Sequence, residues 1–147
     1  MKKTKKAMND SLNLDRFVKA QQDVYPRALS EIRQGRKQSH WIWYVFPQLV
    51  GLGHSYNARY YGIRNRAEAE AYLAHPVLGA RLREISGQLL AVEGRTAREI
   101  LDDVDALKVC SSMTLFDAVS PNDIFGEVLD KYYGGQRCQL TLGMLDE

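Results

Sequence analysis

The chain has 147 residues, of which 45% are hydrophobic and 26% charged, and its formal net charge at pH 7 is +2. This length and composition are typical of one globular domain with an ordinary core, and we expect a single helical domain over residues 11–147. Four lysines against one aspartate in residues 1–10 account for more than the whole net charge, so the rest of the chain is slightly acidic. A slightly acidic body lacks the basic face that a nucleic acid requires, and we predict no nucleic-acid partner.

Residues 1–10 are predicted to be a disordered, lysine-rich tail, because four lysines without periodic apolar partners cannot offset the entropy of ordering. No apolar segment follows the lysines, so a signal peptide is not expected. The longest apolar run, Trp41 to Pro47, is far shorter than the roughly 20 residues of a membrane span. Cys110 and Cys138 lie far apart without metal-ligand spacing, and we expect reduced thiols rather than a disulfide or a zinc site. The chain is therefore predicted to be cytoplasmic, with no membrane partner, no metal and no cofactor.

The first two helices are predicted from their boundary residues. Asn13 is suited to cap a helix whose apolar residues recur at helical spacing. Pro26 disfavours a helical conformation at the residue before it and fits the first turn of a second helix, which Gly35 ends.

The segment 40–46, with sequence HWIWYVF, is apolar on every face and is predicted to be buried at the centre of the domain. Periodicity does not separate a short helix from a strand in such a run. β-propensity favours a strand. Helical neighbours and a possible cap at Ser39 favour a helix, which we predict, and Pro47 ends it.

The remaining boundaries are marked by capping residues. Ser55 and Asn65 each precede a helical stretch, and Thr96 with Glu99 forms a capping box. Helices are expected over 55–60, 67–74, 77–92, from 96 onward, 122–133 and, more weakly, 139–145. Residues 102–118 are expected to form a turn followed by a helix. The sequence thus predicts an all-α fold, a compact single domain of many helices.

Three blocks together resemble a known family. They are GRKQSHWIWYVFPQ (35–48), AYLAHPVLG (71–79) and LKVCSSMTLF (107–116). Their order and spacing resemble the DUF1810 family, a bacterial and fungal group of unknown function, over residues 14–133. The resemblance implies a small helical domain and implies no activity, cofactor or catalytic residue. Such relatives usually read Lys-Leu-Arg-Ser-Ser where this chain has Cys110 in place of the arginine, so a role that needs this arginine is not expected.

Candidate catalytic residues are His40, Lys108 and Ser112. An imidazole walled by aromatic rings would act as a neutral base near pH 7, and the alternative is a core histidine bonded to the backbone. A serine nucleophile needs a general base, which Lys108 or a histidine would supply to Ser112. The alternative is a polar helical turn that satisfies buried backbone groups, and the chain has no GxSxG motif.

Other residues are candidates for a ligand site. Glycines and the N-terminus of a helix can bind an anion, aromatic rings can stack on a base, and a guanidinium can bind a phosphate. These candidates are Trp43, Gly51, Gly53, Ser55, Tyr60 and Arg64. The alternative is an ordinary glycine turn with a serine cap, and interior packing of the rings.

The favoured hypothesis is a small-molecule site for a phosphorylated or nucleotide-like ligand, ADP-ribose-like compounds included, which the protein binds or hydrolyses. The alternative is a non-catalytic protein-interaction module that uses exposed aromatic residues of the 56–61 region. The sequence does not indicate an oligomeric state.

Overall fold

The computed structural model describes residues 13–145, and this part of the chain forms nine α-helices and no strand. The fold is all-α, as predicted. The helices are α2 (Asp15–Gln21), α3 (Tyr25–Arg33), α4 (Ile42–Val45), α5 (Tyr56–Tyr60), α6 (Arg66–Ala74), α7 (Leu78–Ala91), α8 (Ala97–Val119), α9 (Ile124–Tyr133) and α10 (Gln139–Leu145). The predicted tail, residues 1–10, lies outside the described residues.

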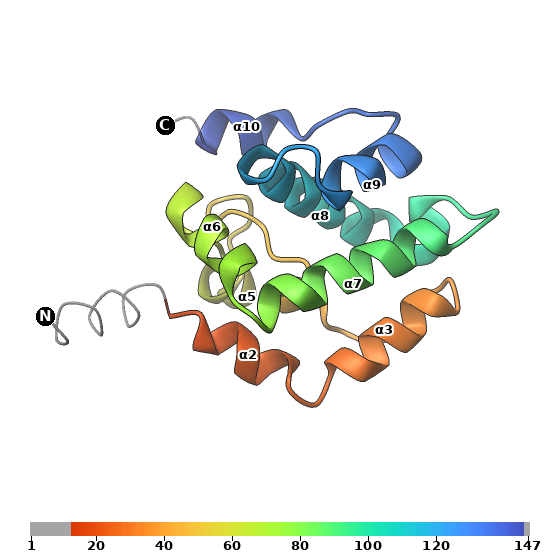
Figure 1. Cartoon of the computed structure of the whole chain (residues 1–147), viewed down its shortest axis with the longest axis horizontal. Helices are drawn as coiled ribbons and strands as arrows, with labels where there is room; N and C mark the ends of the chain where they lie inside the picture. Colours follow the sequence, from red (N-terminus) through yellow and green to blue (C-terminus); the bar gives the residue numbers. More distant parts are fainter. Residues whose placement is uncertain (1–12, 146–147) are drawn as a thin grey trace, which may run out of the picture.

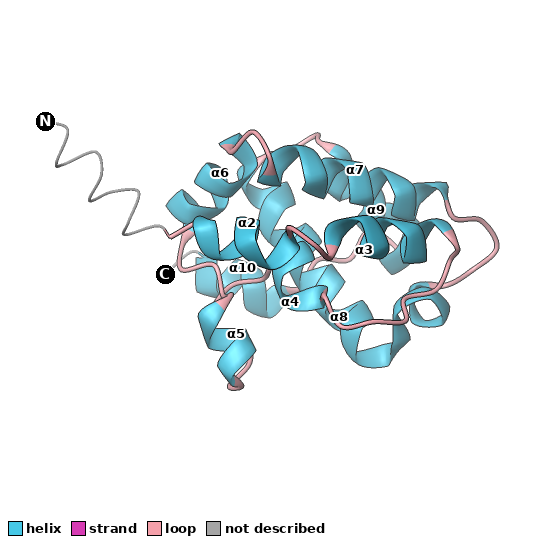
Figure 2. Ribbon diagram, turned by 90° about the horizontal axis from the view of Figure 1, so that it is seen from below, coloured by secondary structure: helices cyan, strands magenta, loops and turns pink. Residues whose placement is uncertain are grey.

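Helix α7 runs across the molecule, with α3 on one side of it and α8 and α9 on the other (Figure 1). α6 packs against both α7 and α8, α10 lies along α8, and α4 contacts α2 and α8. Seen from below, α5 stands out from the other helices (Figure 2). One core joins these elements, and its largest fully buried side chains are Trp41, Tyr72, Phe17, Phe46, Phe116 and Phe125.

Three helices begin at the predicted capping residues. The side chain of Ser55 accepts a hydrogen bond at the start of α5, and that of Asn65 does so at the start of α6. Thr96 and Glu99 form the predicted capping box of α8. The prediction for Asn13 is wrong, because α2 has no side-chain cap and Asn13 adopts a φ of 49° that turns the chain into the helix.

Helix α8 is interrupted near its start. Asp102 has φ 70° and ψ 168°, which are non-helical values in a region that residues other than glycine rarely adopt. The predicted turn followed by a helix is confirmed, because the kink separates a first short piece from the long second piece of α8.

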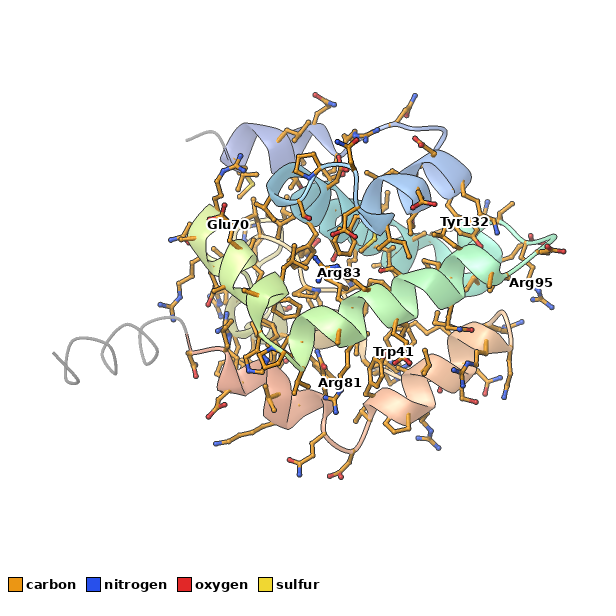
Figure 3. All side chains as sticks on the ribbon, in the orientation of Figure 1. Trp41, Glu70, Arg81, Arg83, Arg95 and Tyr132 are labelled. Carbon is orange, nitrogen blue, oxygen red and sulfur yellow. The ribbon has the colours of Figure 1, made fainter. Side chains whose placement is uncertain are left out.

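The apolar segment 40–46 forms one helical turn, α4. Its buried residues are Trp41, Ile42, Val45 and Phe46. Figure 3 shows Trp41 in the interior between α3 and α7. His40 is exposed, so the expectation of a buried imidazole is wrong: a single turn preceded by a loop cannot hide every side chain. Ser39 does not cap α4 either, since its hydroxyl donates to Oε2 of Glu31 at 2.6 Å.

The loop that precedes α5 is held by a short parallel pairing of Leu49 with Ile63. The backbone N–H of Val50 donates to the carbonyl oxygen of Ile63, and the N–H of Ile63 donates to that of Gln48, both at 2.8 Å. These bonds fix the course of residues 48–53 although they belong to no helix.

A buried ion pair holds the segment that follows α5. Nη1 of Arg16 lies 3.1 Å from Oε2 of Glu68, and both side chains are almost completely buried. The same guanidinium donates to the carbonyl oxygens of Tyr60 and Gly62, which ties the end of α5 to α2 and α6.

Within residues 13–145, no helix combines the length and the apolar character that crossing a membrane requires.

Candidate functional site

A hollow of about 410 Å³ opens at one end of the bundle, and we call it the apolar pocket. Its wall comes from α4, the loop before α5, the second piece of α8 and the chain around the start of α10. The lining residues are Trp43, Gln48, Leu52, Gly53, Val104, Leu107, Lys108, Cys110, Ser111, Cys138 and Leu140. Carbon atoms dominate this wall, and its polar side chains are few, as in sites that bind the body of an organic molecule.

One face of α8 forms the floor of the apolar pocket. Val104, Leu107, Lys108 and Ser111 are spaced so that they fall on the same side of an α-helix. This face begins directly after the kink at Asp102, so the kink determines where the helical part of the floor starts.

The rest of the wall includes residues of α4 and of the loop before α5. Trp43 projects from the single turn of α4, and Leu52 and Gly53 follow from the loop that the Leu49–Ile63 pairing holds. A Cβ atom added to Gly53 would lie 3.0 Å from the Cβ of Ala58, so a larger residue would push this wall against α5.

Lys108 supplies the cationic side chain of the apolar pocket. Its ammonium lies 4.2 Å from the centre of the Trp43 ring and 3.3 Å from Oδ1 of Asp105. Oδ2 of Asp105 also lies 2.9 Å from Nζ of Lys37. The single carboxylate is thus shared by two lysines, so the positive charge of Lys108 is only partly balanced and remains available to one acidic group.

Cys138 is fixed against α8 by its backbone. Its N–H donates to Oγ1 of Thr114 at 2.9 Å, and the Thr114 hydroxyl donates to the carbonyl oxygen of Cys110 at 2.8 Å. Oγ of Ser111 lies 3.4 Å from Sγ of Cys138. The apolar pocket therefore has a thiol held beside a hydroxyl in its wall.

The two thiols of the apolar pocket differ in acidity. Burial raises the pKa of Cys110, and the neighbouring Cys138 adds to this effect. Burial also acts to raise the pKa of Cys138, but hydrogen bonds, of which that from Ser111 is the largest, outweigh it and leave this pKa below its usual value. Cys138 thus carries more thiolate than Cys110 at a given pH.

Three of the nine residues predicted from the sequence meet in the apolar pocket: Trp43, Gly53 and Lys108. The proposed catalytic group does not assemble. His40 is exposed and is absent from the lining, and Ser112 is completely buried, with no hydrogen-bond partner for its hydroxyl among residues 13–145. The serine that lines the apolar pocket is the neighbouring Ser111.

The other four candidates lie outside the lining. Gly51 is exposed at a φ of 101°, and Ser55 uses its hydroxyl to cap α5. Tyr60 is 42% exposed and stacks on Tyr56 at 5.5 Å. Arg64 is exposed beyond the end of α5.

Cys110, Cys138 and Ser111 are among the lining residues that were not predicted as site residues from the sequence. The cysteines are 28 positions apart without a CxxC motif, and no local pattern places them together. Within the described residues, no three histidine, cysteine, aspartate or glutamate side chains gather as metal ligands would.

The chain is similar to a protein family and to a protein of known structure. The profile of a family described as "protein of unknown function (DUF1810)" matches residues 11–145. The crystal structure of the conserved hypothetical protein Rv1873 from Mycobacterium tuberculosis is similar, with 48% sequence identity and a TM-score of 0.91 over 93% of this chain and 99% of that one. No curated protein matches the chain. The match of the profile over nearly the whole chain shows that the chain belongs to the DUF1810 family.

Proposed function

We propose that the protein binds a small molecule with a flat, largely apolar body in the apolar pocket. The observation that carries the proposal is the pocket itself, a hollow of about 410 Å³ whose wall is mostly carbon and includes the half-buried ring of Trp43. A hollow of this size and character is typical of small-molecule sites. Stacking on the ring and burial of the ligand's apolar surface supply most of the binding free energy.

Polar groups at the wall select the polar end of the ligand. Lys108 favours one acidic group, and the Gln48 amide offers hydrogen bonds beside it. A simple aromatic carboxylate fits this set. A phosphorylated or nucleotide-like ligand, such as an ADP-ribose-like compound, would place its base on Trp43 and one phosphate near Lys108 and Gly53.

A thermal-shift series tests the proposal and separates these ligand classes. The probes are 1-naphthoate and indole-3-acetate for the first class, and AMP and ADP-ribose for the second. A ligand at 100 times its dissociation constant raises the free energy of unfolding by about 2.7 kcal/mol. Leu107→Gln, a change at a side chain that is 71% exposed, should reduce the shift without unfolding the protein. Val77→Gln is the matched control, since Val77 is an exposed apolar residue outside the lining.

An interaction surface is the second candidate, and exposed apolar side chains at the rim of the apolar pocket favour it. Val104, Leu107 and Leu140 are 62%, 71% and 70% exposed. Contiguous apolar patches of this kind mark contact surfaces. The partner tested is a second copy of the chain. Sedimentation velocity compares the oligomeric state of the wild type with that of Leu107→Gln. Self-association that Leu107→Gln abolishes, together with no ligand shift, would favour this candidate.

We further propose that the protein is cytoplasmic. Both cysteines are free, and two half-buried free thiols are typical of a reducing compartment.

A further inference from the structure

The apolar pocket contains two thiols beside a cavity, and neither is used in the binding function above. We propose that Cys138 is a nucleophile that forms a covalent bond with apolar molecules carrying a carbon–carbon double bond conjugated to a carbonyl group. This inference rests on the proposed function, because the pocket must first bind the apolar body of the molecule.

The position of Cys138 supports this role. The residue is half-buried and lines the apolar pocket, so a molecule in the pocket lies against it. The bond from its N–H to Thr114 holds the backbone in place, and Thr114 is itself buried. The sulfur cannot turn freely into solvent without giving up the contact with Ser111 at 3.4 Å.

The partners of Cys138 favour the reactive form of the thiol. A thiolate is the nucleophile in such reactions. The Ser111 hydroxyl has two acceptors within reach for its one hydrogen, the carbonyl oxygen of Leu107 at 3.2 Å and Sγ of Cys138 at 3.4 Å, and donation to the sulfur stabilises the thiolate. The second thiol, Cys110, has its Sγ 4.0 Å from the carbonyl oxygen of Gln136, an acceptor that favours the protonated form. The two cysteines therefore divide into a nucleophile and a neutral neighbour.

The reaction is an addition and needs no oxidant. The thiol of Cys138 releases its proton to solvent, and the thiolate attacks the carbon at the far end of the double bond. A sulfur–carbon bond forms and the π bond breaks, with its electron pair moving to the enolate oxygen. Water then supplies one proton to the carbon next to the carbonyl, so that S–H has been added across the double bond.

Labelling of the wild-type chain with a matched pair of electrophiles tests the inference. N-phenylacrylamide carries a ring that fits against Trp43, and acrylamide has the same reactive bond without the ring. Peptide mass spectrometry measures the rate at which each electrophile labels Cys138 and Cys110. Each labelling rate is divided by the rate at which the same electrophile reacts with free glutathione. We expect Cys138 to prefer N-phenylacrylamide by about tenfold or more after this division, with a rate that saturates as its concentration rises.

Variants assign the effect to the pocket. Val77→Gln, which lies outside the lining, should leave the preference unchanged, and Leu107→Gln should reduce it. Cys138→Ser should lose the adduct. Faster labelling of Cys110 than of Cys138 would overturn the inference. So would a ratio of the N-phenylacrylamide rate to the acrylamide rate at Cys138 that equals the same ratio for glutathione.

A saturated analogue separates this inference from the binding function. N-phenylpropanamide has the same shape and cannot react. If it raises the melting temperature and slows labelling of Cys138, both proposals are supported. If it raises the melting temperature while Cys138 labels no faster than Cys110, the covalent step is rejected and the binding function stands. If it does neither and labelling shows no saturation, both are rejected.

Discussion

The indole N–H of Trp41 donates a hydrogen bond of 2.8 Å to Oε1 of Glu31, and both side chains are buried. The same carboxylate accepts the backbone N–H groups of Gln38 and Ser39 and the hydroxyl of Ser39. One charged acceptor thereby ties the turn between α3 and α4 to α3 and satisfies the buried indole N–H of Trp41. Because Trp43 lies two residues beyond Trp41, this anchor also positions one wall of the apolar pocket.

The two tryptophans should differ sharply in what they contribute to stability. Trp41 is completely buried, and Trp41→Ala should lower the free energy of unfolding by about 3–5 kcal/mol. Trp43 is half-buried at the pocket, and Trp43→Ala should cost about 1–2 kcal/mol. Urea denaturation measures both. Equal losses in the two variants would contradict the assignment of Trp41 to the core.

Glu31 should make stability depend on pH in acid. Burial disfavours its charge, but its four hydrogen bonds outweigh burial and lower the pKa of Glu31 from 4.5 to about 2. A lowered pKa in the folded state contributes stability that is present above the unfolded value and lost as the pH falls. The contribution should therefore be complete above pH 4.5 and disappear as the pH falls from 4.5 toward 2.

Glu31→Gln provides the test. At neutral pH the variant should lose roughly 2–3 kcal/mol, since an amide cannot accept all four donors. Below pH 4.5 its stability should fall less steeply than that of the wild type. Urea denaturation at several pH values measures both effects, with the exposed Glu93→Gln as control. Parallel curves for wild type and Glu31→Gln would show that this carboxylate is not the titrating group.

The kink in α8 stores backbone strain that a single substitution should release. Asp102 has a φ of 70°, which costs an L-residue free energy and costs glycine almost none. Asp102→Gly should raise the free energy of unfolding by about 1 kcal/mol. Asp103→Gly, one position later in the regular helix, should lower it by about 1 kcal/mol. Thermal unfolding of the pair measures the difference, and loss of stability in both variants would refute the strain.

Local signals explain how much of the fold could be predicted. Thr96 and Glu99 are three residues apart, and Asn65 bonds to the N–H of Glu68 just beyond it, so both caps depend only on neighbours in the sequence. Such short-range bonds can be predicted without knowledge of how distant parts of the chain pack. Ser39 shows the limit of this reasoning, because its hydroxyl is taken by Glu31 from the preceding helix.

The candidate site was predicted only in part because it depends on distant contacts. Ser111 and Cys138 lie 27 positions apart and meet only after α8 and α10 have packed together. Ser111 and Ser112 are adjacent and chemically identical. Only the way in which α8 packs determines that Ser111 lies on the face toward the apolar pocket and Ser112 on the face toward the core. The imidazole of His40 and its aromatic neighbours in the sequence predicted a general base. His40 lies in the loop before α4, however, and its side chain is exposed to solvent.

Lys108 should select acidic ligands over neutral ones. Lys108→Met keeps an unbranched apolar stem beside Trp43 and removes only the charge, so the wall of the apolar pocket is preserved. The dissociation constant of 1-naphthoate should rise about tenfold, while that of the neutral 1-naphthamide should change little. Lys37→Met is the matched control, because Lys37 also pairs with Asp105 but is absent from the lining. Calorimetric titration at low and high salt measures each constant, and the effect of Lys108→Met should shrink as salt screens the charge. An equal loss with Lys37→Met, or with the amide, would mean that Lys108 acts through Asp105 rather than on the ligand.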